Sequence, residues 1–194
     1  MWKKRGLVPL LIVGAIAVGI RFLPKSVTES LPGGLATATM PDSELYYLVE
    51  GSVYDGDTLR VQRCGEQCEE LKIRLCGIDA PEKDQQFGIE SRDHLRSLID
   101  QGIEDGRLIV LPVEQDQYGR TVAEIFVPLA TGEAEIHLTS QMVMDGYAYH
   151  YERYSSGCPN GHLLAGAEEQ ARSRSAGVWV NPNAVKPWDY RRSQ

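Results

Sequence analysis

The chain has 194 residues, of which 42% are hydrophobic, so it can bury one core and is not an intrinsically disordered protein. Its formal net charge is −7, and the basic residues of its first 25 positions leave 15 basic against 27 acidic side chains in the remainder. This acidic balance argues against a protein that holds nucleic acid by charge alone, and it suits an enzyme that gathers carboxylates around a cation.

The N-terminal segment, residues 1–25, joins a short basic stretch to an apolar run. Lys3, Lys4 and Arg5 precede residues 6–23, which are apolar apart from Arg21. As a helix this run would be roughly 27 Å long, close to the thickness of a hydrocarbon core. The basic start favours a cytoplasmic N-terminus. The segment therefore predicts a transmembrane anchor with the domain outside the cytoplasm, at the cell surface or in the periplasm. Secretion after signal cleavage and a buried core helix are the alternatives.

Residues 26–43 are rich in Pro, Gly, Ser and Thr and predict a flexible linker. The folded domain is expected over residues 44–180, followed by a C-terminal tail over residues 181–194. Alternating apolar residues predict strands over residues 44–54, 58–63, 71–75, 107–113 and 121–127. Helical spacing predicts helices over residues 82–99, 136–145 and 163–175. Five short strands with helices inserted among them indicate a small closed barrel of the α+β class.

The four cysteines allow more than one interpretation. Cys64 and Cys68 flank a predicted hairpin loop, so they form either a cross-strand disulfide or two unpaired thiols. Together with Cys158 and His162 they also resemble a split set of zinc ligands, although the spacing is loose. Cys76 lies in an apolar strand and is expected to be a small buried residue.

Three charged segments stand out from their surroundings: residues 55–58 (Asp-Gly-Asp-Thr), residues 74–82, and residues 116–120 (Asp-Gln-Tyr-Gly-Arg). Each alone has an ordinary structural explanation, since Asp and Gly are common in turns and a buried Arg usually forms a salt bridge. Their occurrence in this order on a barrel-like strand pattern is much more specific.

The second segment suggests a metal site. Arg74 lies in an otherwise apolar strand, where a charge is costly unless an anion meets it. Asp79 and Glu82 follow within one tight stretch, and two carboxylates so close repel each other unless a cation or a proton lies between them. A hard divalent cation such as Ca²⁺, which binds carboxylate and carbonyl oxygens, would resolve this repulsion.

On these three segments, and through residues 142–148 and 167–179, the chain resembles the staphylococcal-nuclease-like, or thermonuclease, family. The resemblance covers about residues 45–180. It implies an OB-like five-stranded β-barrel with three helices. It also implies an enzyme that cleaves DNA and RNA with Ca²⁺ and leaves 3′-phosphorylated products.

The resemblance implies roles for individual residues. Asp57 and Asp79 are expected to bind Ca²⁺ through their carboxylates, and Ala80 through its main-chain carbonyl. Glu82 is the expected general base, acting on the attacking water.

Arg74 and Arg120 are the expected guanidinium groups that grip the phosphate. Tyr118 and Tyr154, and with less support Tyr151, are expected to contact the nucleotide, although packing at the barrel mouth is the alternative.

Two departures from the family are visible. Gln117 stands where the best-known member has a lysine, which removes one phosphate-facing charge. The cysteines at 64, 68 and 158 are not part of the basic family pattern. A non-catalytic binding module is the main competing hypothesis, but such modules usually lose the acidic and arginine positions that are present here. The expected partners are a nucleic acid substrate and a membrane, and no protein partner is evident.

Overall fold

The computed structural model describes residues 44–65, 67–102, 106–130 and 135–194. The predicted anchor and linker lie outside these residues. No helix in the described part of the chain is long and apolar enough to span a membrane.

The strands are β1 (Glu44–Leu48), β2 (Thr58–Cys64), β3 (Cys68–Leu75), β4 (Ile78–Asp79), β5 (Arg107–Gln115), β6 (Thr121–Pro128), β7 (Glu135–His137) and β8 (Tyr149–His150). The α-helices are α1 (Gly88–Ile99), α2 (Leu138–Met144), α3 (Glu152–Ser155), α4 (Leu164–Ser173) and α5 (Pro187–Arg192). Two 3₁₀ turns, η1 (Gly161–Leu163) and η2 (Gly177–Val180), flank α4.

The main sheet closes on itself. Its strand order is β3-β2-β1-β5-β6-β7, and an additional pairing joins β3 to β6. That pairing is parallel and sets Arg74 opposite Val122, whereas the other neighbours in the sheet are antiparallel. Strands β1, β2, β3, β5 and β6 therefore form a ring, which confirms the predicted five-stranded closed sheet in an α+β domain.

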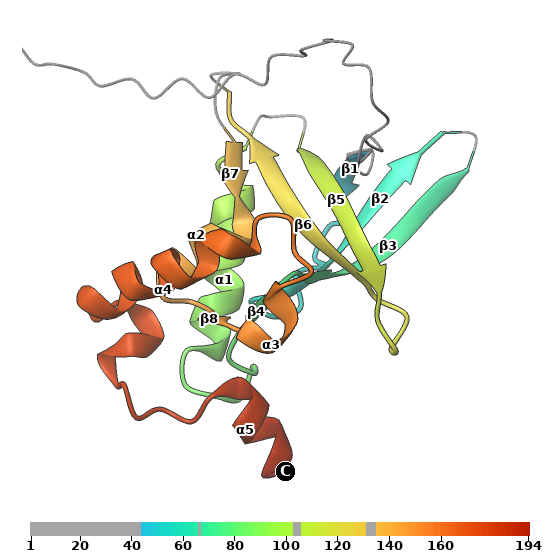
Figure 1. Cartoon of the computed structure of the whole chain (residues 1–194). Helices are drawn as coiled ribbons and strands as arrows, with labels where there is room; N and C mark the ends of the chain where they lie inside the picture. The colour runs from blue at the N-terminus through green and yellow to red at the C-terminus, as the bar shows by residue number, and fades with distance from the viewer. Residues whose placement is uncertain (1–43, 66, 103–105, 131–134) are drawn as a thin grey trace, which may run out of the picture. The chain divides into compact units, whose positions relative to one another are not determined.

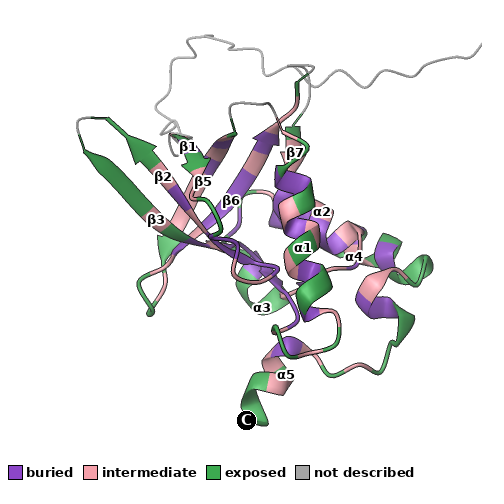
Figure 2. Cartoon of the chain, turned by 180° about the vertical axis from the view of Figure 1, so that it is seen from behind, coloured by how far each residue is buried: buried purple, intermediate pink, exposed green. Residues whose placement is uncertain are grey.

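Alternation along the strands builds the core inside this ring. Leu59 and Val61 of β2 and Ile73 of β3 are fully buried, while the residues between them are more exposed. Figure 2 shows buried residues along β6 and in α1 and α2, where the sheet and the helices meet. Leu95 of α1 and Leu138 of α2 belong to the same buried cluster, so the helices seal one side of the sheet.

Helices α1, α2 and α4 correspond to the three predicted helices and lie together beside the sheet in Figure 1. Helix α1 begins at Gly88, six residues later than the start predicted at residue 82. Phe87 has φ 69°, outside the right-handed helical region, and a Cβ at Gly88 would lie 1.8 Å from the carbonyl oxygen of Glu82. The chain therefore turns tightly before the helix, and Glu82 is left on a loop.

Strand β1 is also shorter than the strand predicted over residues 44–54. It ends at Leu48, and a turn follows in which Gly51 has φ 69°. Helix α5 lies in the stretch predicted only as a tail. It begins with Pro187, whose fixed φ suits the first turn of a helix.

All four cysteines are paired in two disulfides. Cys64 and Cys68 face each other across the β2–β3 hairpin and are bonded, as the first interpretation predicted. Cys76 is buried, as predicted, and it is bonded to Cys158, a pairing that the sequence analysis did not predict. The zinc interpretation is wrong, because disulfide sulfurs are not free thiolate ligands.

Candidate active site

A cavity with a volume of about 910 Å³ opens beside the ring. Seven of the eight predicted site residues line it: Asp57, Arg74, Ala80, Glu82, Tyr118, Arg120 and Tyr154. The eighth, Asp79, is fully buried and reaches the cavity through the arginines that contact it. The structure therefore brings together residues that are distant along the sequence.

A tight loop presents Asp57 to the cavity. The Asp57 amide donates a 3.0 Å hydrogen bond to Oδ1 of Asp55, which is the geometry of an Asx turn. Gly56 packs so closely that a Cβ there would lie 1.8 Å from Oγ of Ser91 in α1. Burial raises the pKa of Asp55, and the positive charge of Arg74 opposes this shift.

Arg74 lies between the two aspartates predicted to bind metal. Its Nη1 pairs with Oδ1 of Asp57, and its Nη2 pairs with Oδ1 of Asp79 at 2.7 Å. Nη2 also donates to the carbonyl oxygen of Ile78 at 3.0 Å. Burial lowers the pKa of Arg74, and the neighbouring carboxylates of Asp79 and Asp55 counteract this effect. One guanidinium thus neutralises two buried carboxylates.

Ala80 and Asp57 are also joined directly. The amide of Ala80 donates a 2.7 Å hydrogen bond to Oδ2 of Asp57. This bond fixes the Ala80 backbone beside the carboxylate, across a sequence separation of 23 residues. The expected role of the Ala80 carbonyl as a metal ligand stays a prediction.

The sequence analysis missed Arg191, which enters the cavity from α5. Its Nη1 contacts Oε1 of Glu82 at 2.7 Å, and its Nη2 contacts Oδ2 of Asp79 at 2.7 Å. Although burial lowers the pKa of Arg191, its hydrogen bonds to Asp79 and Glu82 raise it overall. The only sequence signal was weak: a proline, two aromatic residues and two arginines within a stretch that lacks a longer periodic pattern.

The loop between β5 and β6 presents Arg120. Oδ1 of Asp116 accepts hydrogen bonds from the amides of Tyr118 and Arg120, both at 2.9 Å, and Oδ2 accepts one from Nε of Arg120 at 2.7 Å. Gly119 has φ 75°, which completes the tight turn. Burial alone would raise the pKa of Asp116, but the bonds from Arg120 lower it overall. Asp116 therefore aims Arg120 along the cavity wall.

Three tyrosines lie at the mouth of the cavity. Tyr118 is 74% exposed and Tyr154 is 54% exposed, and the guanidinium groups of Arg120 and Arg153 lie over their respective rings. Tyr151 is less open, because it stacks on Trp188 with ring centroids 4.7 Å apart and packs edge-on against Tyr154. Tyr118 and Tyr154 remain available for contact with a flat aromatic ligand.

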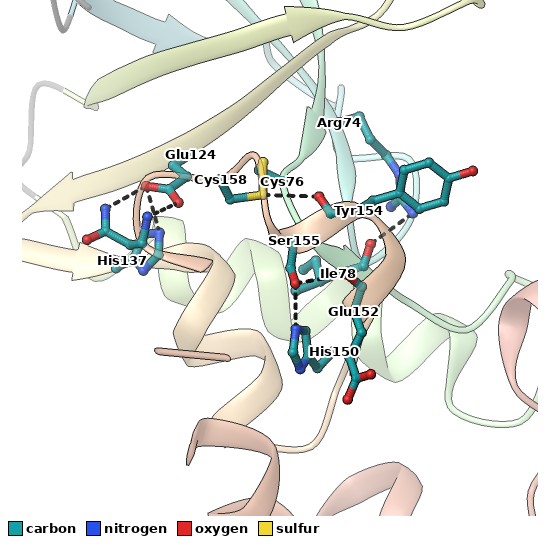
Figure 3. The surroundings of a disulfide bond; sticks show 11 residues. Arg74, Cys76, Ile78, Glu124, His137, His150, Glu152, Tyr154, Ser155 and Cys158 are labelled. Atoms are coloured by element: carbon teal, nitrogen blue, oxygen red, sulfur yellow. Dashed lines mark hydrogen bonds and ion pairs between the residues drawn. A yellow bond between two sulfur atoms is a disulfide. The ribbon is translucent and has the colours of Figure 1, made fainter. Parts of the chain in front are cut away.

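The Cys76–Cys158 disulfide supports the floor of this site. Figure 3 shows it between Arg74 and Tyr154 on one side and Glu124 and His137 on the other. Sγ of Cys158 contacts the carbonyl oxygen of Tyr154 at 3.5 Å. Cys76 directly follows β3, the strand that carries Arg74, and Cys158 lies in the loop after α3, the helix that carries Tyr154. The bridge therefore ties these two parts of the site together.

The donor set is chemically suited to a hard cation. Asp57, Asp79 and Glu82 offer only oxygen, which Ca²⁺ prefers. In the part of the chain that the structure describes, no three acidic, His or Cys side chains are arranged as a ready metal cage. The guanidinium groups of Arg74 and Arg191 bind these carboxylates instead. The three carboxylates thus concentrate negative charge, which the two guanidinium groups neutralise.

Comparisons with known proteins show the family to which the chain belongs. Residues 72–181 match the family model described as "Staphylococcal nuclease homologue". The matched range contains Arg74, Asp79, Glu82 and Arg120, whereas Asp57 lies before it.

Individual relatives show the same similarity. A micrococcal nuclease of Shigella flexneri is 34% identical over 144 residues, which cover 73% of this chain and 78% of the relative. An uncharacterized endonuclease of Escherichia coli O157:H7 is 31% identical over 140 residues, covering 72% of this chain and 80% of the relative. A staphylococcal-like nuclease of Arabidopsis thaliana is 32% identical over 126 residues, covering 65% of this chain and 35% of the relative.

Proposed function

Because the chain belongs to the staphylococcal nuclease family, we propose that it is a Ca²⁺-dependent nuclease that hydrolyses DNA and RNA and leaves 3′-phosphorylated products. The observation that carries the proposal is the convergence of Asp57, Glu82, Arg74 and Arg120 on one cavity, with Asp79 directly behind it. These residues come from the loop before β2, from β3, from β4 and the loop after it, and from the loop before β6.

Asp57 and Asp79 would hold the calcium ion, together with the carbonyl of Ala80. The bound ion would supply charge to neutralise the phosphate and to make a nearby water more acidic. The amide of Ala80, bonded to Asp57 at 2.7 Å, keeps the first of these carboxylates in place before any ion arrives.

Glu82 is suited to act as the general base. It lies on a loop rather than in helix α1, it lines the cavity, and its side chain is 34% exposed, so a water molecule can reach it. A carboxylate in this position accepts a proton from the water that attacks phosphorus.

Arg74 and Arg120 would bind the phosphate from two sides. A guanidinium donates two parallel hydrogen bonds to phosphoryl oxygens and stays charged at any working pH. These bonds strengthen as negative charge develops on the phosphate, so they favour the transition state over the bound substrate. Tyr118 and Tyr154 would stack on bases without selecting a sequence, which suits an enzyme that accepts both DNA and RNA.

We also propose that residues 1–25 tether the enzyme to a membrane and place the domain outside the cytoplasm, with secretion after cleavage as the alternative. The two disulfides of the domain support this proposal, because such bonds persist in oxidising compartments.

The test is a plasmid-nicking assay on the full chain in a mild detergent, first with Ca²⁺ and then with excess EGTA. We expect cleavage with Ca²⁺, loss with EGTA and recovery when Ca²⁺ is restored. Asp57→Asn should require much more Ca²⁺ for half-maximal activity, whereas Asn substitution of the exposed Asp93 on α1 should behave like the wild type. Labelling of product ends checks the 3′-phosphate. Tight DNA binding without cleavage would favour the non-catalytic module instead.

A further inference from the structure

The C-terminal segment, residues 185–191, lies against the wall of the proposed active site. Nε2 of Gln85 donates a 2.7 Å hydrogen bond to the carbonyl oxygen of Val185, and the hydroxyl of Tyr190 donates a 2.9 Å bond to Asp84. Trp188 stacks on Tyr151 within 10° of parallel. These contacts join α5 to the loop that carries Glu82 and to the tyrosines at the cavity mouth.

Arg191 makes the contact that matters for chemistry. Both terminal nitrogens reach Asp79, Nη1 to Oδ1 at 3.1 Å and Nη2 to Oδ2 at 2.7 Å, and Nη1 also contacts Glu82. Oδ1 of Asp79 additionally accepts from Arg74. Every oxygen of the Asp79 carboxylate is therefore bonded to a guanidinium, and Arg191 accounts for one of them alone.

A divalent cation and Arg191 compete for the same carboxylates, because each brings positive charge to them. Ca²⁺ binds carboxylate oxygens at about 2.3–2.6 Å. The guanidinium of Arg191 contacts the same carboxylates and carries a positive charge, so it repels the cation. The loss of Arg191 would in turn leave Asp79 and Glu82 short of positive charge until a cation arrives. The two positive groups therefore weaken each other's binding at this carboxylate pair.

We propose that helix α5 is a built-in competitor of the catalytic cation: Arg191 holds Asp79 and Glu82 while the cation is absent and withdraws when the cation binds. This inference rests on the proposed function, because it assigns Asp79 to the cation. Competition from Arg191 would set the cation concentration at which the enzyme becomes active.

The segment is suited to leave. Helix α5 has six residues, which is too short to be stable without its tertiary contacts. Trp188 packs against Tyr149 and Tyr151 and holds the start of the helix, but the end that carries Arg191 is exposed, as is the bond of Tyr190. A helix end held by few buried contacts opens at low free-energy cost, so Arg191 can withdraw while Trp188 stays in place. The Cys76–Cys158 bridge and the ring do not depend on α5.

The first experiment measures Ca²⁺ affinity by isothermal titration calorimetry on the full chain in a mild detergent, without substrate. Arg191→Ala should bind Ca²⁺ roughly three- to tenfold more tightly, as expected when partly exposed ion pairs no longer oppose binding. Arg192→Ala is the matched control. It removes the same charge from the next residue, whose ion pair is with Asp189, and should leave the affinity near that of the wild type.

The second experiment detects the movement of Arg191 itself. Trypsin must take the arginine side chain into its own pocket, so cleavage after Arg191 reports that the guanidinium has left Asp79. Intact mass measurement should show faster loss of residues 192–194 with Ca²⁺ than with EGTA, at trypsin activities matched on a small peptide. Asp79→Asn should remove this Ca²⁺ dependence.

The outcomes separate the two proposals. Unchanged or weaker Ca²⁺ binding by Arg191→Ala, with normal Ca²⁺-dependent cleavage of DNA, overturns the competitor and leaves the proposed function intact. An equal gain from Arg192→Ala shows a general charge effect and also overturns it. Absence of both Ca²⁺ binding and nuclease activity in the wild type and in Arg191→Ala overturns the proposed function and this inference with it.

Discussion

The carboxylate of Asp116 holds the side chain of Arg120 by its Nε at 2.7 Å, and no other described residue is bonded to the two terminal nitrogens of that arginine. The ion pair thus fixes the direction of the guanidinium and leaves its outer edge for a ligand. This arrangement distinguishes Arg120 from Arg74, whose terminal nitrogens are both bonded to aspartates.

Arg120→Ala should therefore lower kcat by about 10²–10³ with little change in stability. The lost donor acts on the phosphate in the transition state, whereas the partly exposed ion pair with Asp116 contributes at most about 1 kcal/mol. Steady-state kinetics and thermal unfolding on the same preparation check both parts. A rise in KM at unchanged kcat would contradict a role in the transition state.

Arg74→Ala should lower both activity and stability. It leaves the buried carboxylates of Asp57 and Asp79 without their shared partner, which costs about 3–5 kcal/mol. Urea denaturation measures the loss, and added Ca²⁺ should restore part of it. Arg60→Ala is the matched control on the neighbouring strand, because Arg60 pairs with Glu70 at the exposed surface. Similar costs for the two variants would show that the Arg74 pairs are not stabilising.

Glu82→Gln should lower the rate by about 10²–10⁴, the usual contribution of a general base, while Ca²⁺ binding stays nearly intact. Glutamine keeps the size of the side chain but cannot take the proton. Single-turnover cleavage of a labelled oligonucleotide measures the effect, and Glu90→Gln on the exposed part of α1 is the control. Full activity of Glu82→Gln would rule out this residue as the base.

The two disulfides should differ in their contribution to stability. Cys76 and Cys158 close a loop across 82 residues, whereas Cys64 and Cys68 are separated by 4. The chain-entropy model gives the longer loop a contribution about 2.5 kcal/mol larger. Urea denaturation of the two double Cys→Ala variants measures this difference. An equal or greater loss from the hairpin pair would contradict the model.

Stability should decrease as the pH falls from 7 toward 5, in part through His137. Burial lowers the pKa of His137, although the nearby carboxylate of Glu124 opposes the shift. The unfolded chain takes up a proton near pH 6.5 while the folded chain does not, so the free energy of unfolding falls until the pH reaches the folded pKa. His137→Gln should show a shallower decrease in unfolding free energy over this range. Identical slopes would exclude His137 as a source.

Much of the fold follows from local pattern. Alternation in residues 58–63 and 121–127 predicted β2 and β6, because each strand has one face in the core. The positions of Asp57, Arg74, Asp79, Glu82 and Arg120 were predicted by three short motifs, since each motif also builds its own turn. These features depend on neighbours within a few residues, and such neighbours are visible in sequence.

Features that depend on distant partners were not predicted. Cys76 looked like an ordinary core residue, because its partner is 82 positions away. Arg191 contacts Asp79 across 112 residues, and α5 has no periodicity of its own. The late start of α1 depends on the close approach of Gly88 to Glu82, a backbone contact that side-chain periodicity does not report.

The parallel pairing of β3 with β6 has a consequence for the chain during its synthesis. The pairing sets Arg74 opposite Val122. Arg74 on β3 and Arg120, which directly precedes β6, are therefore brought together only when these two strands pair. A polypeptide synthesised only as far as the loop after β4 already contains Asp57, Arg74, Asp79 and Glu82, yet it lacks Arg120 and the strand β6. The ring and the complete set of candidate site residues can therefore form only after β6 has been synthesised.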